Sequence, residues 1–103
     1  MQPKFKIHIV NSTLADYEHA RAWWAAHRPK APLAIEEDFD EAMQRLEEHG
    51  DKIGAPIGPL RRGYRRLLLP RVRYYVYFRH LDKAGVIEVL ALWHVSRGEP
   101  PQI

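Results

Sequence analysis

The chain has 103 residues, a mass of 12.1 kDa and 46% hydrophobic residues, so we expect one small domain spanning residues 1–103 around a single modest core. It contains no cysteine, which excludes disulfide bridges, thiolate metal ligands and cysteine nucleophiles. No apolar run reaches the roughly 20 residues of a membrane-spanning helix, and residues 1–5 lack the apolar stretch of a secretory signal, so we expect a cytoplasmic protein without a membrane partner.

Charge is divided unevenly along the chain. Residues 1–51 contain 6 Lys/Arg and 10 Asp/Glu, a balance of −4, whereas residues 52–103 contain 10 Lys/Arg and 3 Asp/Glu, a balance of +7, which together give the net charge of +3. This asymmetry predicts an acidic helical side and a basic side that attracts polyanions or an acidic protein segment. The alternative is that scattered surface arginines only keep a small domain soluble.

The first half predicts one strand and two helices. Residues 5–10 alternate apolar and polar side chains and are rich in Ile and Val, as in a strand. Ser12 or Thr13 can cap a first helix that ends at Pro29. Its apolar stripe consists of Leu14, Tyr17, Ala20 and Trp24. The neighbouring Trp23 and Trp24 cannot both face the core squarely.

A second helix is expected after Pro32, with Gly50 as its C-cap. Its apolar residues recur at helical spacing, and they are Ile35, Phe39, Ala42, Met43 and Leu46. The acids between them occupy the other faces of this helix. Those in its first turns favour the positive end of the helix dipole, so most of this acidic run has a structural purpose.

The second half predicts a loop and three strands. Residues 52–59 contain two glycines and two prolines and indicate a loop. Residues 63–69, 72–80 and 86–95 have strand composition, and they are joined by a turn around Pro70 and by residues 81–85. The order βααβββ predicts an α+β fold in which a helical hairpin packs on one face of a mainly antiparallel sheet of about four strands.

The strand at residues 72–80 has two different faces. Alternation assigns Val72, Tyr74, Val76 and Phe78 to the core side. The opposite side receives Arg73, Tyr75, Tyr77 and Arg79. Because both helices are needed on the core side, we expect the second set to form an uncovered cationic and aromatic face on which a partner docks.

The last strand, residues 86–95, is apolar on both faces apart from Glu88 and His94, which predicts a central position with Trp93 in the core. Two interpretations of His94 remain open. It caps the end of a packed strand, with one ring nitrogen bonded to the backbone. Alternatively it is a general acid or base beside Arg97, since an unperturbed pKa of about 6.5 allows proton exchange near neutrality.

Other kinds of site lack support in the sequence. The remaining histidines show no i, i+4 pair on one helix and have no thiolate partners, so we expect no metal. No glycine-rich phosphate loop and no G-x-S-x-G elbow occurs, and we expect no cofactor.

Several segments, in this order, resemble the RelE/ParE superfamily of type II toxins. They are Gly63-Tyr64-Arg65-Arg66-Leu67, Tyr74-Tyr75-Val76-Tyr77-Phe78-Arg79, Val86-Ile87-Glu88-Val89-Leu90-Ala91-Leu92-Trp93-His94 and Ser96-Arg97-Gly98. The resemblance implies a bacterial toxin that arrests growth and is silenced by a cognate antitoxin, whose extended and helical segment wraps the toxin.

The superfamily divides into two functional classes. A ParE-like toxin poisons DNA gyrase without bond-making chemistry of its own, whereas a RelE-like toxin is a metal-independent endoribonuclease that cuts messenger RNA on the ribosome. If this chain cleaves RNA, its candidate catalytic residues are His94, Arg79, Arg97 and Tyr77. The candidate residues for binding a target or nucleic acid are Arg61, Arg65, Arg66, Arg73 and Tyr75.

We favour the ParE-like class. No lysine lies between Lys52 and Lys83, whereas RelE-like enzymes tend to combine lysines and arginines, and the closing Trp93-His94-x-x-Arg97-Gly98 looks closer to ParE. A third possibility is a sequence-tolerant nucleic-acid binder that stacks bases on Tyr75 and Tyr77.

Overall fold

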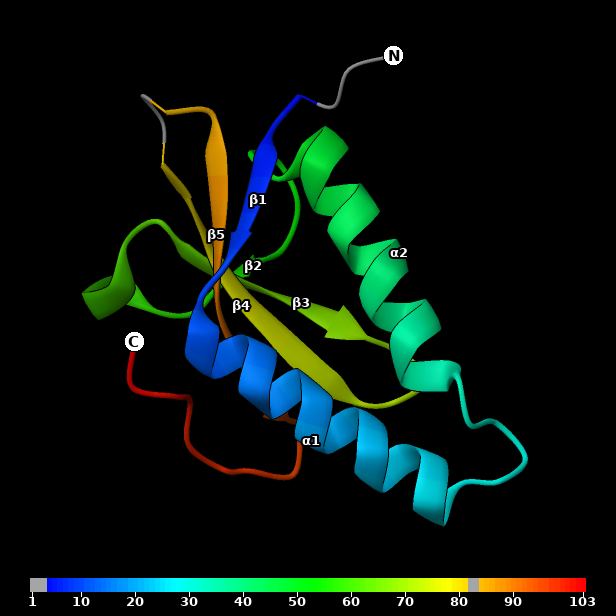
Figure 1. The fold of residues 1–103 in the computed structure, drawn as a ribbon. Coiled ribbons are helices and arrows are strands. Elements are labelled where there is room, and N and C mark those ends of the chain that lie inside the picture. Colours follow the sequence, from blue (N-terminus) through cyan, green and yellow to red (C-terminus); the bar gives the residue numbers. More distant parts are fainter. Residues whose placement is uncertain (1–3, 82–83) are drawn as a thin grey trace.

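Two helices cover one face of a five-stranded sheet in the computed structural model, which describes residues 4–81 and 84–103 (Figure 1). The elements in chain order are β1 (Lys6–Ile9), α1 (Asn11–His27), α2 (Ala34–His49), β2 (Ala55–Pro56), the 3₁₀ turn η1 (Pro59–Arg61), β3 (Tyr64–Leu69), β4 (Tyr74–Leu81) and β5 (Val86–His94). The α+β class and the helical hairpin are confirmed.

The sheet is mixed, with strand order β1-β5-β4-β3-β2. β1 runs parallel to β5, and the other neighbours are antiparallel. β5 therefore has a partner on each side, as its apolar composition predicts. The prediction of about four strands missed β2, because its two residues, Ala55 and Pro56, lie in a segment rich in glycine and proline.

Parts of two predictions lie outside the described residues. The turn expected at residues 81–85 includes Asp82 and Lys83, and the start of the chain includes residues 1–3.

α2 supplies most of the helical part of the core. Ile35, Phe39, Ala42 and Leu46 are buried, as their spacing predicts. Gly50 is the C-cap residue, as expected; its backbone angles are right-handed and its N–H donates to the carbonyl oxygen of Leu46. A Cβ at this position would lie 2.6 Å from Cδ1 of Ile87. The glycine is therefore needed for close packing of the helix end against β5.

α1 is more exposed than its apolar stripe predicts. Ala20 is buried and Tyr17 and Trp24 pack against the core, but Leu14 is 43% exposed. Val10 is the N-cap residue in place of Ser12 or Thr13, and Thr13 is buried within the first turn. Trp23 is 46% exposed, so only one of the two tryptophans packs inward.

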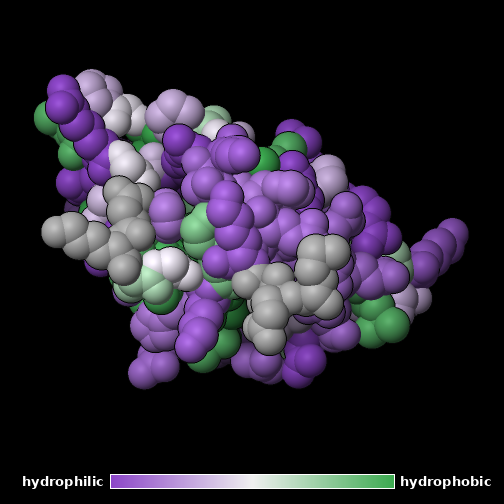
Figure 2. Space-filling model, turned by 90° about the horizontal axis from the view of Figure 1, so that it is seen from above, coloured by the Kyte–Doolittle hydropathy of each residue, from purple (hydrophilic) through white to green (hydrophobic). Residues whose placement is uncertain are grey.

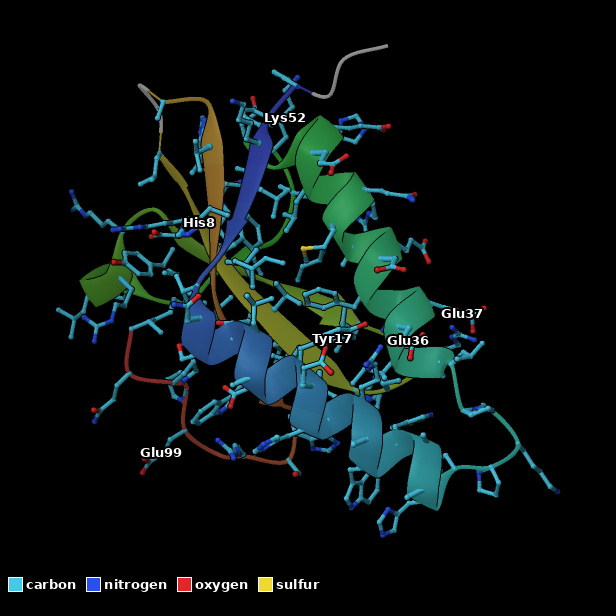
Figure 3. All side chains as sticks on the ribbon, in the orientation of Figure 1. His8, Tyr17, Glu36, Glu37, Lys52 and Glu99 are labelled. Carbon is cyan, nitrogen blue, oxygen red and sulfur yellow. The ribbon has the colours of Figure 1, made fainter. Side chains whose placement is uncertain are left out.

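Tyr17 joins the two helices. Its ring stacks on Phe39 at a centroid distance of 4.4 Å, and Figure 3 shows it directed from α1 toward α2, near Glu36. Burial raises the pKa of Tyr17, and the carboxylates of Asp40 and Glu36 raise it further. The phenol therefore stays neutral where the acidic helix meets the core.

Candidate functional site

The outer face of the sheet, on the side away from the helices, is only partly open. Tyr75, which we expected to be uncovered, is half-buried, and Tyr77 is 1% exposed. The prediction that Tyr77 lies on an uncovered face is therefore wrong. The Tyr75 ring lies 6.2 Å from that of Tyr77, and Arg66 Nη1 donates to the Tyr77 hydroxyl at 3.4 Å.

The C-terminal segment covers part of this outer face. Trp93 Nε1 donates to the carbonyl oxygen of Glu99 at 2.7 Å, and Pro101 is buried. Figure 3 shows Glu99 on this segment, which follows β5. Residues 98–100 line the same groove as Tyr77. The sequence pattern could not reveal this because the segment contains no periodic apolar run.

A β-bulge explains why Trp93 is on the outer face and not in the core, where we expected it. Tyr77 pairs with Ala91, but Phe78 pairs with Val89, so the register shifts by one residue at Leu90. Val89 and Ile87 are buried on the helix side. The extra residue reverses the alternation beyond it and turns Trp93 outward.

Two cationic side chains stack on aromatic rings in this outer groove, which has a volume of about 440 Å³. The Arg66 guanidinium lies 4.1 Å from the centroid of Tyr75, and that of Arg97 lies 4.1 Å from Trp93. Tyr75 and Trp93 are cross-strand partners. The four side chains thus form a row across β3, β4 and β5 and the segment after β5.

His94 lies on the opposite face of the sheet. Its ring contacts Tyr74 edge-on at 5.0 Å, and Nδ1 accepts the backbone N–H of Ser96 at 3.1 Å while lying 2.7 Å from Ser96 Oγ. Burial raises the pKa of Tyr74, and the charge of Arg97 opposes this shift. The surroundings of His94 match the interpretation of a histidine that caps the end of a packed strand.

A second cleft, of about 370 Å³, lies between α1 and the ends of β4 and β5. Its lining includes Trp23, Tyr74, His94 and Arg97. Arg97 lines both this cleft and the outer groove, since it lies just beyond the C-terminal end of β5, where both faces of the sheet can be reached.

The four candidate catalytic residues do not converge on one site. His94 faces the helix side, and Tyr77 is buried on the outer side. Arg97 lines the cleft with His94 and the outer groove with Tyr77. Arg79 is held elsewhere, because its Nε donates to Glu88 at 2.8 Å and its Nη1 donates to the Tyr64 hydroxyl at 3.2 Å. The hydrogen bond that Arg79 donates to Glu88 raises the pKa of Arg79. An arginine engaged in this way is poorly placed to receive a phosphate.

The candidate target-binding arginines separate into different environments. Arg65 donates to the carbonyl oxygens of Asp51 and Ile53 at 3.4 and 3.3 Å, so it fixes the loop after α2. Arg73 lies in the turn before β4 with φ of 63°, and its side chain is exposed. Arg61 is exposed in η1. Only Arg66 joins Tyr75 in the outer groove.

The sequence pattern does not predict the pair of Arg71 with Asp38, because Asp38 is one of the acids that the pattern places on the polar faces of α2. Asp38 is buried and accepts Arg71 Nε at 3.0 Å, the Arg71 backbone N–H at 2.9 Å and that of Val72 at 3.3 Å. The hydrogen bonds that Arg71 donates to Asp38 and Glu37 raise the pKa of Arg71. This pair attaches the β3–β4 turn to α2, and its residues are 33 positions apart.

Within residues 4–81 and 84–103, no group of three His, Cys, Asp or Glu side chains could hold a metal ion. No helix in the same part of the chain is long and apolar enough to cross a membrane.

Comparison with known proteins gives two kinds of similarity. The family model for the ParE toxin of type II toxin-antitoxin system, parDE, matches residues 7–98. A solved chain from the chromosomal ParDE TA system of P. aeruginosa has a TM-score of 0.73 and 19% identity, over 90% of this chain and 98% of that one.

The isolated RelE toxin of E. coli has a TM-score of 0.62 and 14% identity, over 92% of this chain and 88% of that one. No curated protein sequence matches the chain. Both structural similarities are at low identity and show the shared fold. Because the family model covers most of the sequence, the chain belongs to the ParE toxin family of type II toxin–antitoxin systems.

Proposed function

We propose that this protein arrests bacterial growth by poisoning DNA gyrase and that a cognate antitoxin neutralises it. Membership of the ParE toxin family supports the general role. The choice of gyrase as the target rests on one observation, the separation of the candidate catalytic residues in the structure. A proton-transfer residue must lie within hydrogen-bond reach of the group whose proton it moves, about 3 Å between heavy atoms, directly or through one water.

RNA cleavage would require a base, an acid and a phosphate-binding cation around one scissile bond. His94 and Tyr77 lie on opposite faces of the sheet, and Arg79 is paired with Glu88. This arrangement favours a toxin that acts by binding.

A cognate antitoxin has suitable contacts on the helical side. Trp23 of α1 is an exposed aromatic side chain and forms a wall of the cleft beside β5. Exposed aromatic and aliphatic side chains beside a cleft are typical anchors for an amphipathic protein segment. We infer that the antitoxin covers this cleft.

A RelE-like ribonuclease is the second candidate, supported by the outer groove. Arg66, Arg97, Tyr75 and the hydroxyl of Tyr77 are close together there. Two cations and two phenols could bind and cleave an RNA phosphate without His94.

A paired assay separates the two candidates. Purified protein is incubated with gyrase and supercoiled plasmid, and separately with ribosomes carrying a messenger RNA. We expect cleaved DNA to accumulate with gyrase and the message to remain intact. Intact DNA together with a cut message would contradict the gyrase proposal and support the ribonuclease.

A further inference from the structure

The turn between β2 and β3 presents an exposed apolar side chain beside two arginines. We call residues 58–63 the η1 tip; it projects from the sheet at the left edge of Figure 1, in green. Leu60 is 90% exposed, far more than Leu14, Trp23 or Leu33. Figure 2 shows one largely hydrophilic face of the molecule on which apolar patches are small and separate. A leucine this exposed is therefore unusual for this protein.

The backbone of the η1 tip is shaped by its own residues. Gly58 and Gly63 have φ of 134° and 81°, a region that suits glycine, and Pro59 lies at the start of the 3₁₀ turn. A Cβ at either glycine would meet no atom within 4 Å. The glycines are thus needed for the backbone conformation of the η1 tip and not for close packing.

Arg61 and Arg62 provide the charge of the η1 tip. Both side chains are exposed, and we find no carboxylate paired with them among residues 4–81 and 84–103. By contrast, Arg71 and Arg79 bind carboxylates. The η1 tip therefore carries two guanidinium groups available to an anion, on the half of the chain whose balance is +7.

The ligand that fits this combination is duplex DNA. Proteins that bind the minor groove often insert one apolar side chain between base steps while cations contact the phosphates on either side. A single strand fits less well, because it needs free aromatic faces, and here Arg66 stacks on Tyr75 and Arg97 on Trp93. An amphipathic helix needs several apolar anchors, and the η1 tip offers one large one.

We propose that the η1 tip contacts duplex DNA, with Leu60 inserted at a minor-groove base step and Arg61 and Arg62 on the flanking phosphates. This rests on the proposed function in one respect, namely that gyrase would bring the DNA to the toxin. Binding to DNA itself can be measured without gyrase, so the two proposals can fail separately.

The charge part is tested with a fluorescein-labelled 20-base-pair duplex, by anisotropy at several salt concentrations. We expect R61A/R62A to weaken binding about tenfold at low salt and to reduce the slope of log Kd against log salt by about 2, one for each lost phosphate contact. The control K30A/R45A removes the same charge from exposed positions on the helical side. Equal losses in both double variants, or none in either, would overturn the proposal.

The apolar part is tested with a duplex containing 2-aminopurine, whose fluorescence rises when a base step opens. Wild-type protein should raise the signal, and Leu60→Ala should abolish the rise while charge-driven binding persists. An unchanged signal with wild-type protein would contradict the proposed insertion of Leu60 into a base step. If R61A/R62A loses duplex binding specifically but wild type traps no gyrase–DNA complex, the DNA contact stands and the gyrase proposal fails.

Discussion

The arginines between residues 61 and 79 include two groups that sequence alone does not distinguish. Arg65, Arg71 and Arg79 are fixed by backbone carbonyls or carboxylates, and they hold a loop, a turn and a strand pair together. Arg61 and Arg62 of the η1 tip are exposed to solvent. Similar residues in one short stretch therefore serve stability in one place and are available for binding in another.

This difference depends on partners that are distant in sequence. Asp38 reaches Arg71 from α2, and Glu88 reaches Arg79 from β5. A count of arginines in the second half consequently overestimates the charge that a ligand can use. The usable charge is concentrated where no helix or neighbouring strand supplies an acid.

The largest effect on stability is expected from a substitution in the core that α2 forms with the sheet. Phe39→Ala should lower the free energy of unfolding by roughly 3 to 5 kcal/mol, because it leaves a cavity under Tyr17. Urea denaturation measures this, with the exposed Gln44→Ala as a control on the same helix. A loss below about 0.5 kcal/mol would mean that the ring is not buried.

A smaller but still clear effect should follow from removing the partner of Arg71. Asp38→Ala leaves the backbone N–H groups of Arg71 and Val72 without their acceptor, and we expect a loss of about 2 to 3 kcal/mol. The exposed Asp40→Ala should change little. R61A/R62A should also lower the free energy of unfolding by less than about 0.5 kcal/mol. A larger loss in this variant would mean that Arg61 and Arg62 also serve stability, as the paired arginines do.

The weakest expected effect concerns acid stability. Burial alone would raise the pKa of Asp51, but the hydrogen bond from Lys4 and the nearby lysine charges lower it overall from 3.8. A lowered pKa means that the folded state prefers the carboxylate. Its contribution is present above the unfolded value and is lost as the pH falls through the folded one.

Lys4→Ala should therefore show a shallower loss of stability than wild type as the pH falls from about 5 to about 2. Denaturation midpoints across this range measure the difference, with Lys6→Ala as the control because Lys6 is also exposed. Parallel curves for wild type and Lys4→Ala would show that the pair does not favour the Asp51 carboxylate.

Periodicity predicted the elements that have long apolar patterns. α2 and the three late strands were predicted within a few residues, and the resemblance to RelE/ParE toxins agrees with the family that the chain belongs to. Non-periodic features were missed. A two-residue strand containing Pro56 has no alternation to detect, and a bulge at Leu90 reverses the face of Trp93 without any change in composition.

The candidate site was predicted less completely for the same reason. Arg66 and Tyr75 do share a groove, with Arg97. The burial of Tyr77 and the engagement of Arg79 depend on the C-terminal segment and on Glu88, whose positions are tertiary. Strand alternation gives the face of a side chain but not what covers it.

The most direct test of the account is colony formation after induced expression of wild type and His94→Ala, at matched soluble levels and with matched thermal stability. We predict that both abolish colony formation, because the proposed binding mechanism gives His94 no role in proton transfer. If His94→Ala remains folded but restores colony formation by ~10²-fold or more, as expected for loss of a general acid or base, the claim that this toxin acts by binding is contradicted.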